Sequence, residues 1–489
     1  TETALVRLGE ANGFDEGDTR QRWPRLTEIP FDSDRKRMTT VHKLESGLDG
    51  SHHISITKGA PKEVMELCSD YYDNQGMIKS LTATERQAIL AANDQFARDG
   101  LRVLAVAYRP LDSEHIGEDK WDMQTLEDNM VFLGLVAMSD PPRQGVREAI
   151  EKCHRASIRI IMVTGDYGLT ALSIAKKIGI VQGDDARVVS GLELAGMDDN
   201  QLKEALKGEI VFARVAPEQK YRVVNALQEL GEVVAVTGDG VNDAPALKTA
   251  DIGAAMGIVG TDVSKEAADI ILTDDNFATI ISAVEEGRRI YDNILKAIQF
   301  LISSNIGEII VLFFATLVNW VEPLIPIHIL WVNLITDSLP ALALSFDPAE
   351  ENIMKRSPVP ANTGIFTKGM IYRIGYQGAM IGILTLIAYR IGIHEDPSNT
   401  ILGQTMAFAV LSLSQLVHVF NIRSKTNSIF KSGIFNNMYL VYAVLCSFIL
   451  MIAVLFIPFL QDIFNVVTLS GRDIMIVVVL SIMPVLIVE

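Results

Sequence analysis

The chain has 489 residues, which at ~150 residues per domain is enough for about three domains. A hydrophobic share of 49% and a mean hydropathy of +0.25 are too high for a wholly soluble protein, whereas 21% charged residues are too many for a chain lying entirely in a membrane. The net charge of −17 argues against a nucleic-acid-binding protein, whose footprint is basic. Three scattered cysteines make neither a disulfide framework nor a zinc site.

Residues 1–125 predict a mixed α+β domain. Strand-like runs at 25–31, 53–58 and 102–108 are interleaved with a helical pattern at 82–97. Such an arrangement is typical of a mostly antiparallel sheet. The first residues carry neither an initiator methionine nor a leader, so we expect the chain to be part of a longer protein.

Residues 126–290 show a different, regularly alternating pattern. Short apolar strands are predicted at 131–138, 159–163, 210–213, 233–236 and 252–254, and helices between them at 143–156, 167–178, 217–230 and 243–248. Alternation of strands and helices is typical of a parallel, doubly wound sheet.

Residues 291–489 are dominated by long apolar runs. A helix needs about 20 apolar residues to cross a bilayer, and six runs meet that length or approach it. They lie at 297–318, 324–346, 371–393, 401–420, 439–460 and 474–488. We expect a transmembrane bundle of about six helices, with buried core helices of a globular protein as the alternative. The basic residues Lys355, Arg356, Lys368 and Arg423 follow the second and fourth spans, which places those loops and the soluble domains in the cytoplasm.

Two of the predicted parallel strands end in polar, glycine-containing turns. One strand leads into Thr164-Gly165-Asp166, and another into the run Thr237–Asp243, which contains Asp239 and Asn242. In doubly wound sheets ligands bind beyond the carboxyl ends of the strands, where glycines let the backbone approach a phosphate. Aspartate and asparagine oxygens are ligands that Mg²⁺ prefers.

A basic side chain accompanies these turns. Lys220 lies on the helix between the two strands and can neutralise a transferring phosphoryl oxygen. The alternative is that these aspartates and glycines only form turns and cap helices. That alternative fits Thr164-Gly165-Asp166 taken alone better than it fits the longer run paired with Lys220.

Polar side chains also interrupt the first two apolar spans. Glu308 and Asp337 each cost about 2.5–3.5 kcal/mol at the bilayer centre if unpaired, and no Lys or Arg lies near them within their spans. Asn305 shares a helix face with Glu308, and Asn333 with Asp337. With Thr336 they offer the oxygen ligands of a hard cation. Interhelical hydrogen bonding is the alternative, and it explains single Asn or Thr residues better than two carboxylates.

Prolines flank the second span and lie within it. Pro323, Pro326 and Pro340 are expected to unwind this helix and to free backbone carbonyls for coordination.

The run Thr237–Asp243 resembles the hinge motif of the P-type cation-transporting ATPases within the haloacid-dehalogenase superfamily. The segments Lys58–Pro61 and Asp140–Arg143 also match motifs of that family. The resemblance implies a haloacid-dehalogenase-like sheet in which Thr164, beside Gly165 and Asp166, holds a phosphoryl oxygen and Lys220 bridges an aspartyl phosphate. It further implies that Asp239 binds Mg²⁺, that Asn242 and Asp243 order the site, and that Arg214 contacts nucleotide.

The same resemblance makes the first domain an ATP-binding domain. It implies that Phe31 stacks on adenine, that Lys58 beside Gly59 meets the ring and phosphates, and that Glu2, Arg102 and Leu104 complete the pocket. From the residues alone, Phe31 and Leu104 are core residues, and Lys58 and Arg102 are solvated charges. Ser33 departs from the family, where arginine is common near the phosphates.

The membrane residues resemble the sarcoplasmic-reticulum type of calcium pump. Asn305, Glu308, Asn333, Thr336 and Asp337 match its calcium-liganding positions, whereas sodium–potassium and proton pumps look different over this stretch. Gln415 in the fourth span stands where calcium pumps with two Ca²⁺ sites carry glutamate. The number of Ca²⁺ ions transported per cycle, one or two, therefore remains open.

The family's nucleophilic Asp-Lys-Thr-Gly-Thr motif is not among these residues, so we expect that the chain alone forms no aspartyl phosphate. We expect the actuator domain and the earlier membrane helices to belong to the same pump, upstream of this chain. The predicted function is ATP-driven Ca²⁺ export across the cell membrane, with Mg²⁺ as cofactor and ATP, Ca²⁺ and the lipid bilayer, but no nucleic acid, as partners. Three alternatives remain: a pump that transports Mn²⁺ or Na⁺, a membrane-anchored phosphatase, and a non-catalytic fragment that binds nucleotide and ions.

Overall fold

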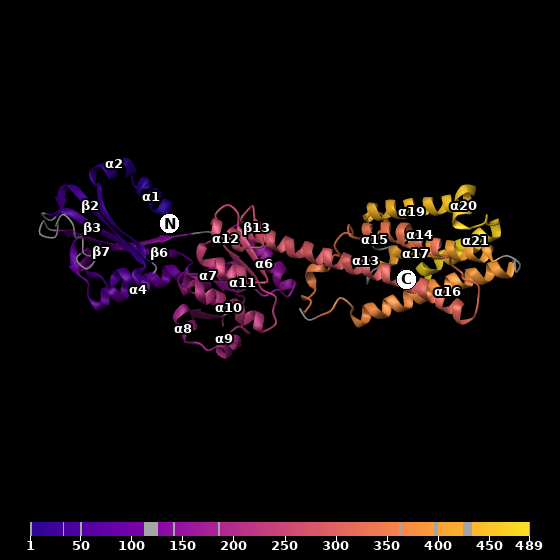
Figure 1. Cartoon of the computed structure of the whole chain (residues 1–489). Coiled ribbons are helices and arrows are strands. Elements are labelled where there is room, and N and C mark those ends of the chain that lie inside the picture. Colours follow the sequence, from indigo (N-terminus) through magenta and orange to yellow (C-terminus); the bar gives the residue numbers. More distant parts are fainter. Residues whose placement is uncertain are drawn as a thin grey trace. The chain divides into compact units, whose positions relative to one another are not determined.

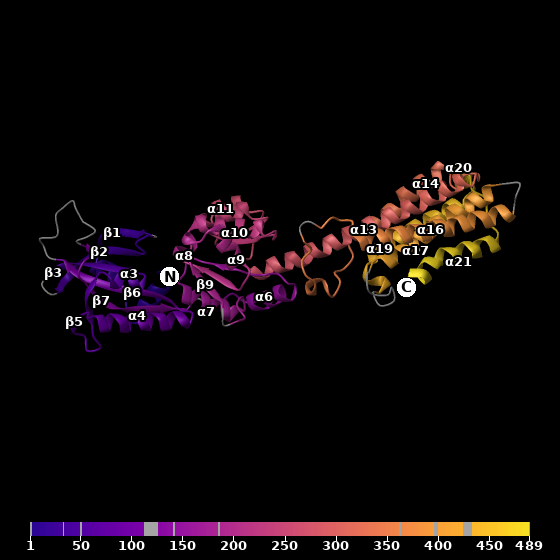
Figure 2. The same ribbon diagram turned by 90° about the horizontal axis from the view of Figure 1, so that it is seen from below.

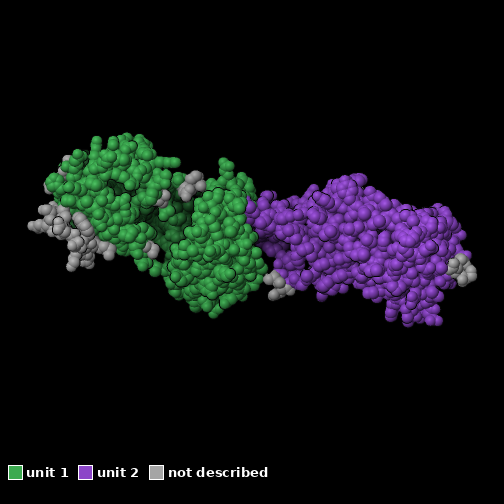
Figure 3. Space-filling view, turned by 45° about the horizontal axis from the view of Figure 1, so that its top comes forward, with its two compact units in different colours: residues 1–151, 159–278 green, residues 152–158, 279–489 purple. Residues whose placement is uncertain are grey.

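The computed structural model describes residues 2–32, 34–48, 51–111, 126–139, 142–183, 186–360, 363–395, 400–423 and 433–488. Ser33, Asp140 and Pro141 lie outside the described residues. The chain divides into two compact units, one formed by residues 1–151 and 159–278 and the other by residues 152–158 and 279–489 (Figure 3).

The first unit begins with a seven-stranded mixed sheet in the order β1-β2-β3-β6-β7-β4-β5, with α4 packed near β6 (Figures 1 and 2). All of its neighbouring strands are antiparallel except the pair β4 and β7, so the predicted α+β domain is confirmed. Its elements are α1 (Glu2–Ala11), α2 (Glu16–Arg22), β1 (Arg25–Asp32), β2 (Arg37–Leu48), β3 (Ser51–Gly59), α3 (Pro61–Met65), β4 (Cys68–Tyr72), β5 (Ile78–Ser80), α4 (Ala83–Arg98), β6 (Arg102–Leu111) and β7 (Met130–Met138).

One predicted strand lies in a different sheet from the one expected. The apolar run at 131–138 was assigned to the parallel sheet, but β7 pairs with β6 and β4 of the seven-stranded sheet. The assignment failed because an apolar strand looks the same whichever sheet buries it. The domain bounds 1–125, 126–290 and 291–489 remain predictions.

The rest of the first unit contains the predicted parallel strands, arranged as two three-stranded parallel sheets rather than one. Their orders are β8-β10-β9 and β11-β12-β13. The elements of this region are α6 (Val146–Arg155), β8 (Met162–Val163), α7 (Gly168–Ile178), β9 (Arg187–Ser190), α8 (Gly191–Gly196), α9 (Asp199–Ala205), β10 (Ile210–Ala213), α10 (Pro217–Glu229), β11 (Ala235–Gly238), η2 (Val241–Asp243), α11 (Ala244–Thr249), β12 (Ile252–Met256), α12 (Asp262–Ala267) and β13 (Ile270–Leu272).

The second unit is helical, and six of its described helices or helix groups are long and apolar enough to cross a membrane, as predicted. They are α13 (Phe277–Leu317), the continuous run α14 (Pro326–Trp331), η3 (Val332–Asp337) and α15 (Ser338–Leu344), then α16 (Lys368–Glu395), α17 (Ile401–Ile422), α19 (Met438–Phe456) and α21 (Gly471–Val488). Three short helices, η4 (Ile353–Lys355), η5 (Ile434–Asn436) and α20 (Pro458–Phe464), lie in connections. α17 has the most buried apolar window of the six, which makes it the centre of the bundle.

The second span contains a π-helix rather than an unwound segment. The π-helix η3 covers Val332–Asp337 and therefore carries Asn333, Thr336 and Asp337. Pro340 lacks an N–H, so it cannot donate the usual helical bond to the Thr336 carbonyl four residues earlier. Wide π turns are found mostly as single turns within α-helices, frequently at functional sites. The expected unwinding was wrong in form, although the irregularity lies where the prolines predicted one.

Glycines bring α13 and α16 together backbone to backbone. A methyl group added at Gly378 would lie 2.8 Å from the Ser303 carbonyl oxygen, and one at Gly382 would lie 3.1 Å from the Gly307 carbonyl oxygen. Gly378 and Gly382 are four residues apart, the small-residue spacing that permits close packing of membrane helices. This contact fixes α16 against the part of α13 that carries Asn305 and Glu308.

Candidate functional site

The polar turn after β11 is built around the carboxylate of Asp243. Lys220 Nζ on α10 donates to Asp243 Oδ1 over 2.6 Å, and the backbone N–H groups of Asp239 and Gly240 donate to Asp243 Oδ2 at 3.2 and 3.1 Å. Asp243 is only 8% exposed. A side chain at Gly238 would place its Cβ 2.4 Å from the Asp243 Cβ, so only glycine fits there. Asp243 therefore shapes the turn.

Asp239 and Asn242 are both exposed, so their side chains are open to a ligand. The Asp239 carbonyl accepts hydrogen bonds from Thr261 N–H at 2.9 Å and from the Ser264 hydroxyl at 3.2 Å. These bonds fix the backbone of Asp239 while its carboxylate remains accessible. Such an arrangement fits a magnesium ligand, with Asp243 already engaged by Lys220.

The turn after β8 is joined to the loop after β10 by backbone hydrogen bonds. The N–H of Arg214 donates to the Asp166 carbonyl at 3.1 Å, and that of Val215 donates to the Thr164 carbonyl at 3.2 Å. The Asp166 N–H donates to the Thr164 hydroxyl at 3.1 Å, and Gly165 is exposed. Because α10 starts two residues after Val215, the helix that carries Lys220 is anchored to the Thr164 turn.

Arg214 lies in a dense group of side chains within the first unit. Its backbone is left-handed, with φ of 53°, and its guanidinium stands 5.2 Å from the centre of the Tyr167 ring and 3.5 Å from Glu63. The Tyr167 hydroxyl donates to Asp94 Oδ1 at 3.1 Å. Sequence reasoning missed Tyr167 and Glu63, because nothing in their local pattern indicates this contact.

The residues expected to bind nucleotide lie on β1, β3 and β6 of the seven-stranded sheet. Lys58 pairs in register with Met38 on one side and Val106 on the other, so it shares a face with Leu104 and Arg102 by the alternation of side chains. Phe31 is 64% exposed, which contradicts a core position and leaves its ring free to stack. Lys58 forms an ion pair with Glu2 on α1. A side chain at Gly59 would collide with Arg37, so close packing explains this glycine.

The membrane residues contribute buried oxygen atoms from three helices. Glu308 on α13 is 5% exposed, whereas Thr336 and Asp337 on η3 and Gln415 on α17 are 0% exposed. Five of their oxygens have no hydrogen-bond partner within the described part of the chain: Glu308 Oε1, Thr336 Oγ1, both carboxylate oxygens of Asp337 and Gln415 Oε1. Buried polar atoms are rarely unpaired in proteins, so these oxygens fit a hard cation as their partner.

The two asparagines differ in their hydrogen-bond partners. Asn333 Nδ2 donates to Glu308 Oε2 at 3.2 Å and thereby joins η3 to α13, whereas Asn305 Nδ2 donates to the Leu301 carbonyl of its own helix at 2.7 Å. The Ser304 hydroxyl on α13 also lies near the Asp337 carboxylate, although neither group has a partner within hydrogen-bond geometry among the described residues. Interhelical hydrogen bonding thus accounts for Asn333 but leaves the five oxygens unexplained.

Neutral oxygens are a necessary part of any cation site here. The described residues contain no group of three or more His, Cys, Asp or Glu side chains that could hold a metal ion. Two carboxylates supplemented by amide and hydroxyl oxygens suit a hard, oxygen-preferring cation better than a thiolate- or imidazole-binding one.

Comparison with known protein families finds matches at both ends of the chain. Residues 1–145 match the family model described as P-type ATPase, cytoplasmic domain N, and residues 321–489 match the model described as cation transporting ATPase, C-terminus. The chain belongs to the P-type cation-transporting ATPases.

Relatives of this P-type ATPase chain align along nearly its whole length. It is 45% identical to a calcium-transporting ATPase 1 of Bacillus cereus, covering 100% of this chain and 55% of the relative. It is 44% identical to a calcium-transporting ATPase of Bacillus subtilis (99% and 53% covered) and 37% identical to a calcium-transporting ATPase 1 of Yarrowia lipolytica (98% and 51%). The chain spans about half the length of the curated relatives it matches.

One buried cluster of this P-type ATPase chain was missed by sequence reasoning altogether. Glu127 accepts hydrogen bonds from Arg35 at 2.9 Å, Arg37 at 2.8 Å and the Thr39 hydroxyl at 2.7 Å. Burial opposes ionisation of Glu127, but the bonds from Thr39, Arg37 and Arg35 outweigh it and hold its pKa below the ordinary value. The cluster ties β2 and the residues before it to the residues just before β7.

Proposed function

We propose that this chain supplies the ATP-binding site, part of the phosphoryl-transfer site and part of the ion site of an ATP-driven Ca²⁺ exporter. The observation that carries the proposal is the set of five unpaired oxygens on Glu308, Thr336, Asp337 and Gln415, because it offers a hard cation a buried site in an integral membrane protein. All three relatives reported above are named calcium-transporting ATPases, which supports Ca²⁺ as that cation.

In this proposal, ATP binds on the face of the seven-stranded sheet that carries Lys58 and Leu104. Phe31, with 64% of its surface exposed, stacks on adenine. Lys58 gives up its ion pair with Glu2 and binds the nucleotide instead. Stacking on an exposed aromatic ring and neutralisation of phosphate by lysine are both favourable. Arg102 and Arg214 complete the pocket.

The γ-phosphoryl group of ATP is transferred to the carboxylate of an aspartate upstream of this chain, and ADP is the leaving group. Lys220, held by Asp243, neutralises charge on the transferring group, and Thr164 donates a hydrogen bond to one of its oxygens. Mg²⁺ bound at Asp239 and the phosphate would bring the charge compensation that phosphoryl transfer requires. Asn242, exposed next to Asp243, orders the ligands of that ion.

The actuator domain and the earlier membrane helices complete the pump from upstream of this chain. The basic residues Lys355 and Arg356 support an orientation with the soluble domains in the cytoplasm. We therefore propose export from the cytoplasm, with the cell membrane as the location.

The test compares the full-length protein with this chain, both labelled with γ-phosphate-labelled ATP in the presence of Ca²⁺, Mn²⁺, Na⁺ or a chelator. We expect hydroxylamine-sensitive labelling of the full-length protein when Ca²⁺ is present. We expect no labelling of the short chain under any of these conditions. Asp337→Asn should abolish the Ca²⁺ dependence, whereas Lys203→Ala, which removes an exposed ion pair with Glu229, should not alter it.

Each other outcome has a definite meaning. Labelling that follows Mn²⁺ or Na⁺ instead of Ca²⁺ would overturn the proposed cargo. Labelling of the short chain would overturn the upstream position of the nucleophile. Tight ATP binding by the full-length protein without any labelling would favour the non-catalytic alternative.

A further inference from the structure

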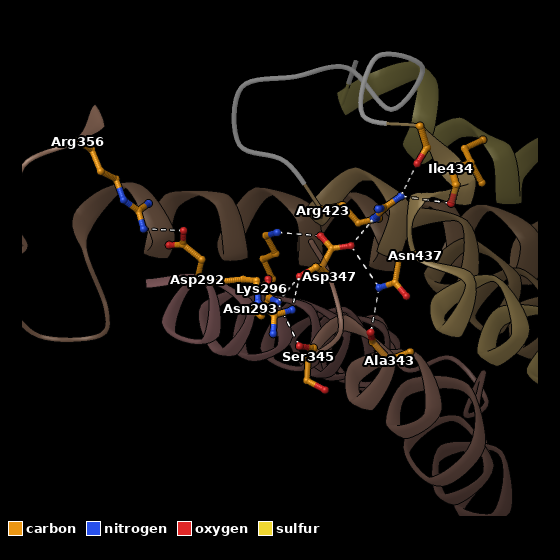
Figure 4. A network of polar contacts seen from close by, with 12 residues as sticks. Asp292, Asn293, Lys296, Ala343, Ser345, Asp347, Arg356, Arg423, Ile434 and Asn437 are labelled. Carbon is orange, nitrogen blue, oxygen red and sulfur yellow. Dashed lines mark hydrogen bonds and ion pairs between the residues drawn. The ribbon is translucent and has the colours of Figure 1, made fainter. Parts of the chain in front are cut away.

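A buried carboxylate lies just after α15, outside both sites described above. Asp347 is 2% exposed, and its Oδ2 accepts a hydrogen bond from Lys296 Nζ on α13 at 2.8 Å (Figure 4). Its Oδ1 accepts from Arg423 Nε, the residue that follows α17, at 2.8 Å and from Asn437 Nδ2, the residue that precedes α19, at 3.2 Å. We call Lys296, Asp347, Arg423 and Asn437 the Asp347 centre.

The backbone around Asp347 is held by further side-chain donors. Asn293 Nδ2 on α13 donates to the Asp347 carbonyl at 2.8 Å and to the Ser345 carbonyl at 3.2 Å, and Asn437 Nδ2 also donates to the Ala343 carbonyl at 3.0 Å (Figure 4). The last carbonyls of a helix have no partner within the helix. Here α13 and α19 supply those partners, so the end of α15 is fixed.

The helices that meet at the Asp347 centre are the ones that carry the buried ion-site oxygens. Lys296 lies about three turns before Glu308 on α13. Asp347 follows Asp337 by ten residues along η3 and α15, and Arg423 follows Gln415 by eight residues at the end of α17. Each of the three ligand-bearing helices thus contributes one group to a single buried ion cluster.

The buried charges of the Asp347 centre restrict movement of these helices relative to one another. Lys296 and Arg423 are 3% and 5% exposed at their side chains and share one carboxylate. Removing one member of a buried ion pair leaves a charge without compensation, so the helices cannot shift relative to one another without separating these charges.

We propose that the Asp347 centre is a positioning device that sets the axial register of α13, α15 and α17 and thereby the spacing of Glu308, Asp337 and Gln415. The inference rests on the proposed function, because its readout is the affinity of the transported cation. Coupling of this kind between separated sites changes affinity by about 5–150-fold.

The experiment uses the full-length protein that contains this chain, with two readouts. One is the Ca²⁺ concentration that gives half-maximal phosphorylation by ATP, and the other is the affinity for ATP at saturating Ca²⁺. Asp347→Asn should raise the half-maximal Ca²⁺ concentration about tenfold and leave ATP affinity unchanged. Lys296→Met should act in the same direction, and the double variant should be no worse than Asp347→Asn, since both changes break one contact.

The matched control is Asp292→Asn, one turn before Lys296 on the same helix. It breaks the 2.7 Å ion pair with Arg356, a residue outside the Asp347 centre, and it should shift the Ca²⁺ response less than twofold. Asn437→Ala, which removes a donor but no charge, keeps the test decisive if Asp347→Asn cannot be purified. It should raise the half-maximal Ca²⁺ concentration about threefold.

A Ca²⁺ response of the Asp347 or Asn437 variant within twofold of the parent would overturn the proposal. An equal shift in the Asp292→Asn control, or a parallel loss of ATP affinity, would show a general structural role instead. Failure of the proposed function is seen separately, in the parent protein, as labelling that ignores Ca²⁺. The same variants are then compared with the cation that does support labelling.

Discussion

Lys220 and Asp243 form a 2.6 Å ion pair in which the carboxylate also accepts two backbone N–H groups of its own turn. The pair joins α10, anchored to the Thr164 turn, to the turn that carries Asp239. A single carboxylate therefore both shapes the predicted magnesium turn and orients the lysine expected to meet the phosphoryl group.

Neutralising either partner of this pair should impair chemistry more than nucleotide binding. For Lys220→Ala we expect the rate of phosphoenzyme formation in the full-length protein to fall by at least about 10²-fold, the usual cost of losing a preorganised charge. Rapid-quench labelling measures the rate, and displacement of a fluorescent nucleotide should show ATP affinity within threefold of the parent. A variant that lost ATP affinity and kept its labelling rate would assign Lys220 to binding alone.

Gly238→Ala should destabilise the first unit. The added Cβ would lie 2.4 Å from the Asp243 Cβ in a turn that cannot relax without breaking the Lys220 pair. Overpacking of this kind costs about 1–3 kcal/mol. Urea unfolding followed by circular dichroism measures it, with Gly208→Ala as the control because nothing lies within 4 Å of a Cβ there. Equal stability of the two variants would contradict the geometry of the turn.

The Glu127 cluster predicts an acid-sensitive sheet. The pKa of Glu127 is lower in the folded state than in the unfolded state, so its contribution is present above the unfolded value and is lost as pH falls through the folded one. We expect the unfolding midpoint of the parent to decrease below about pH 4.5. Glu127→Gln should remove this part of the pH dependence and cost about 1.5–3 kcal/mol at neutral pH, the contribution of hydrogen bonds to a charged group. A parallel pH profile for parent and variant would refute the assignment.

Gln415→Glu should strengthen cation binding at the expense of the cation-free state. The Gln415 side chain is fully buried with both polar atoms unpaired among the described residues, and a carboxylate there would join Glu308 and Asp337. Without a cation the like charges repel, and with Ca²⁺ they are compensated. We expect a lower melting temperature in chelator and a half-maximal Ca²⁺ concentration at least about fivefold lower than in the parent.

Gln404→Glu serves as the control for this change, since Gln404 lies three turns earlier on α17 and donates to the Glu322 carbonyl. It should lower stability without tightening the Ca²⁺ response. Direct measurement of bound Ca²⁺ on the Gln415→Glu variant also counts the ions, a number that the sequence leaves open between one and two.

The sequence predicted those features that depend on neighbouring residues in the chain. The six spans follow from length and hydropathy, and the turn at Thr237–Asp243 follows from residue type and spacing. The sheet to which β7 belongs was missed because pairing depends on residues far away in the chain. The partners of Glu127 and Asp347 were missed for the same reason: Thr39 lies 88 residues from Glu127, and Arg423 lies 76 residues from Asp347. Long-range ion clusters leave no spacing rule in a single sequence.

The close glycine packing of α13 and α16 restricts how an ion site on α13 can open. With Gly378 and Gly382 seated against the Ser303 and Gly307 carbonyls, sliding or rotation would bring larger side chains into this backbone contact, so we expect the two helices to move together near Glu308. A step that exposes Glu308 to one side of the membrane must therefore carry α16 with it, or else leave both in place and move Asp337. The Asp347 centre holds the end of α15 to α13, so a movement of Asp337 requires a local change within the π-helix η3 rather than a shift of the whole second span.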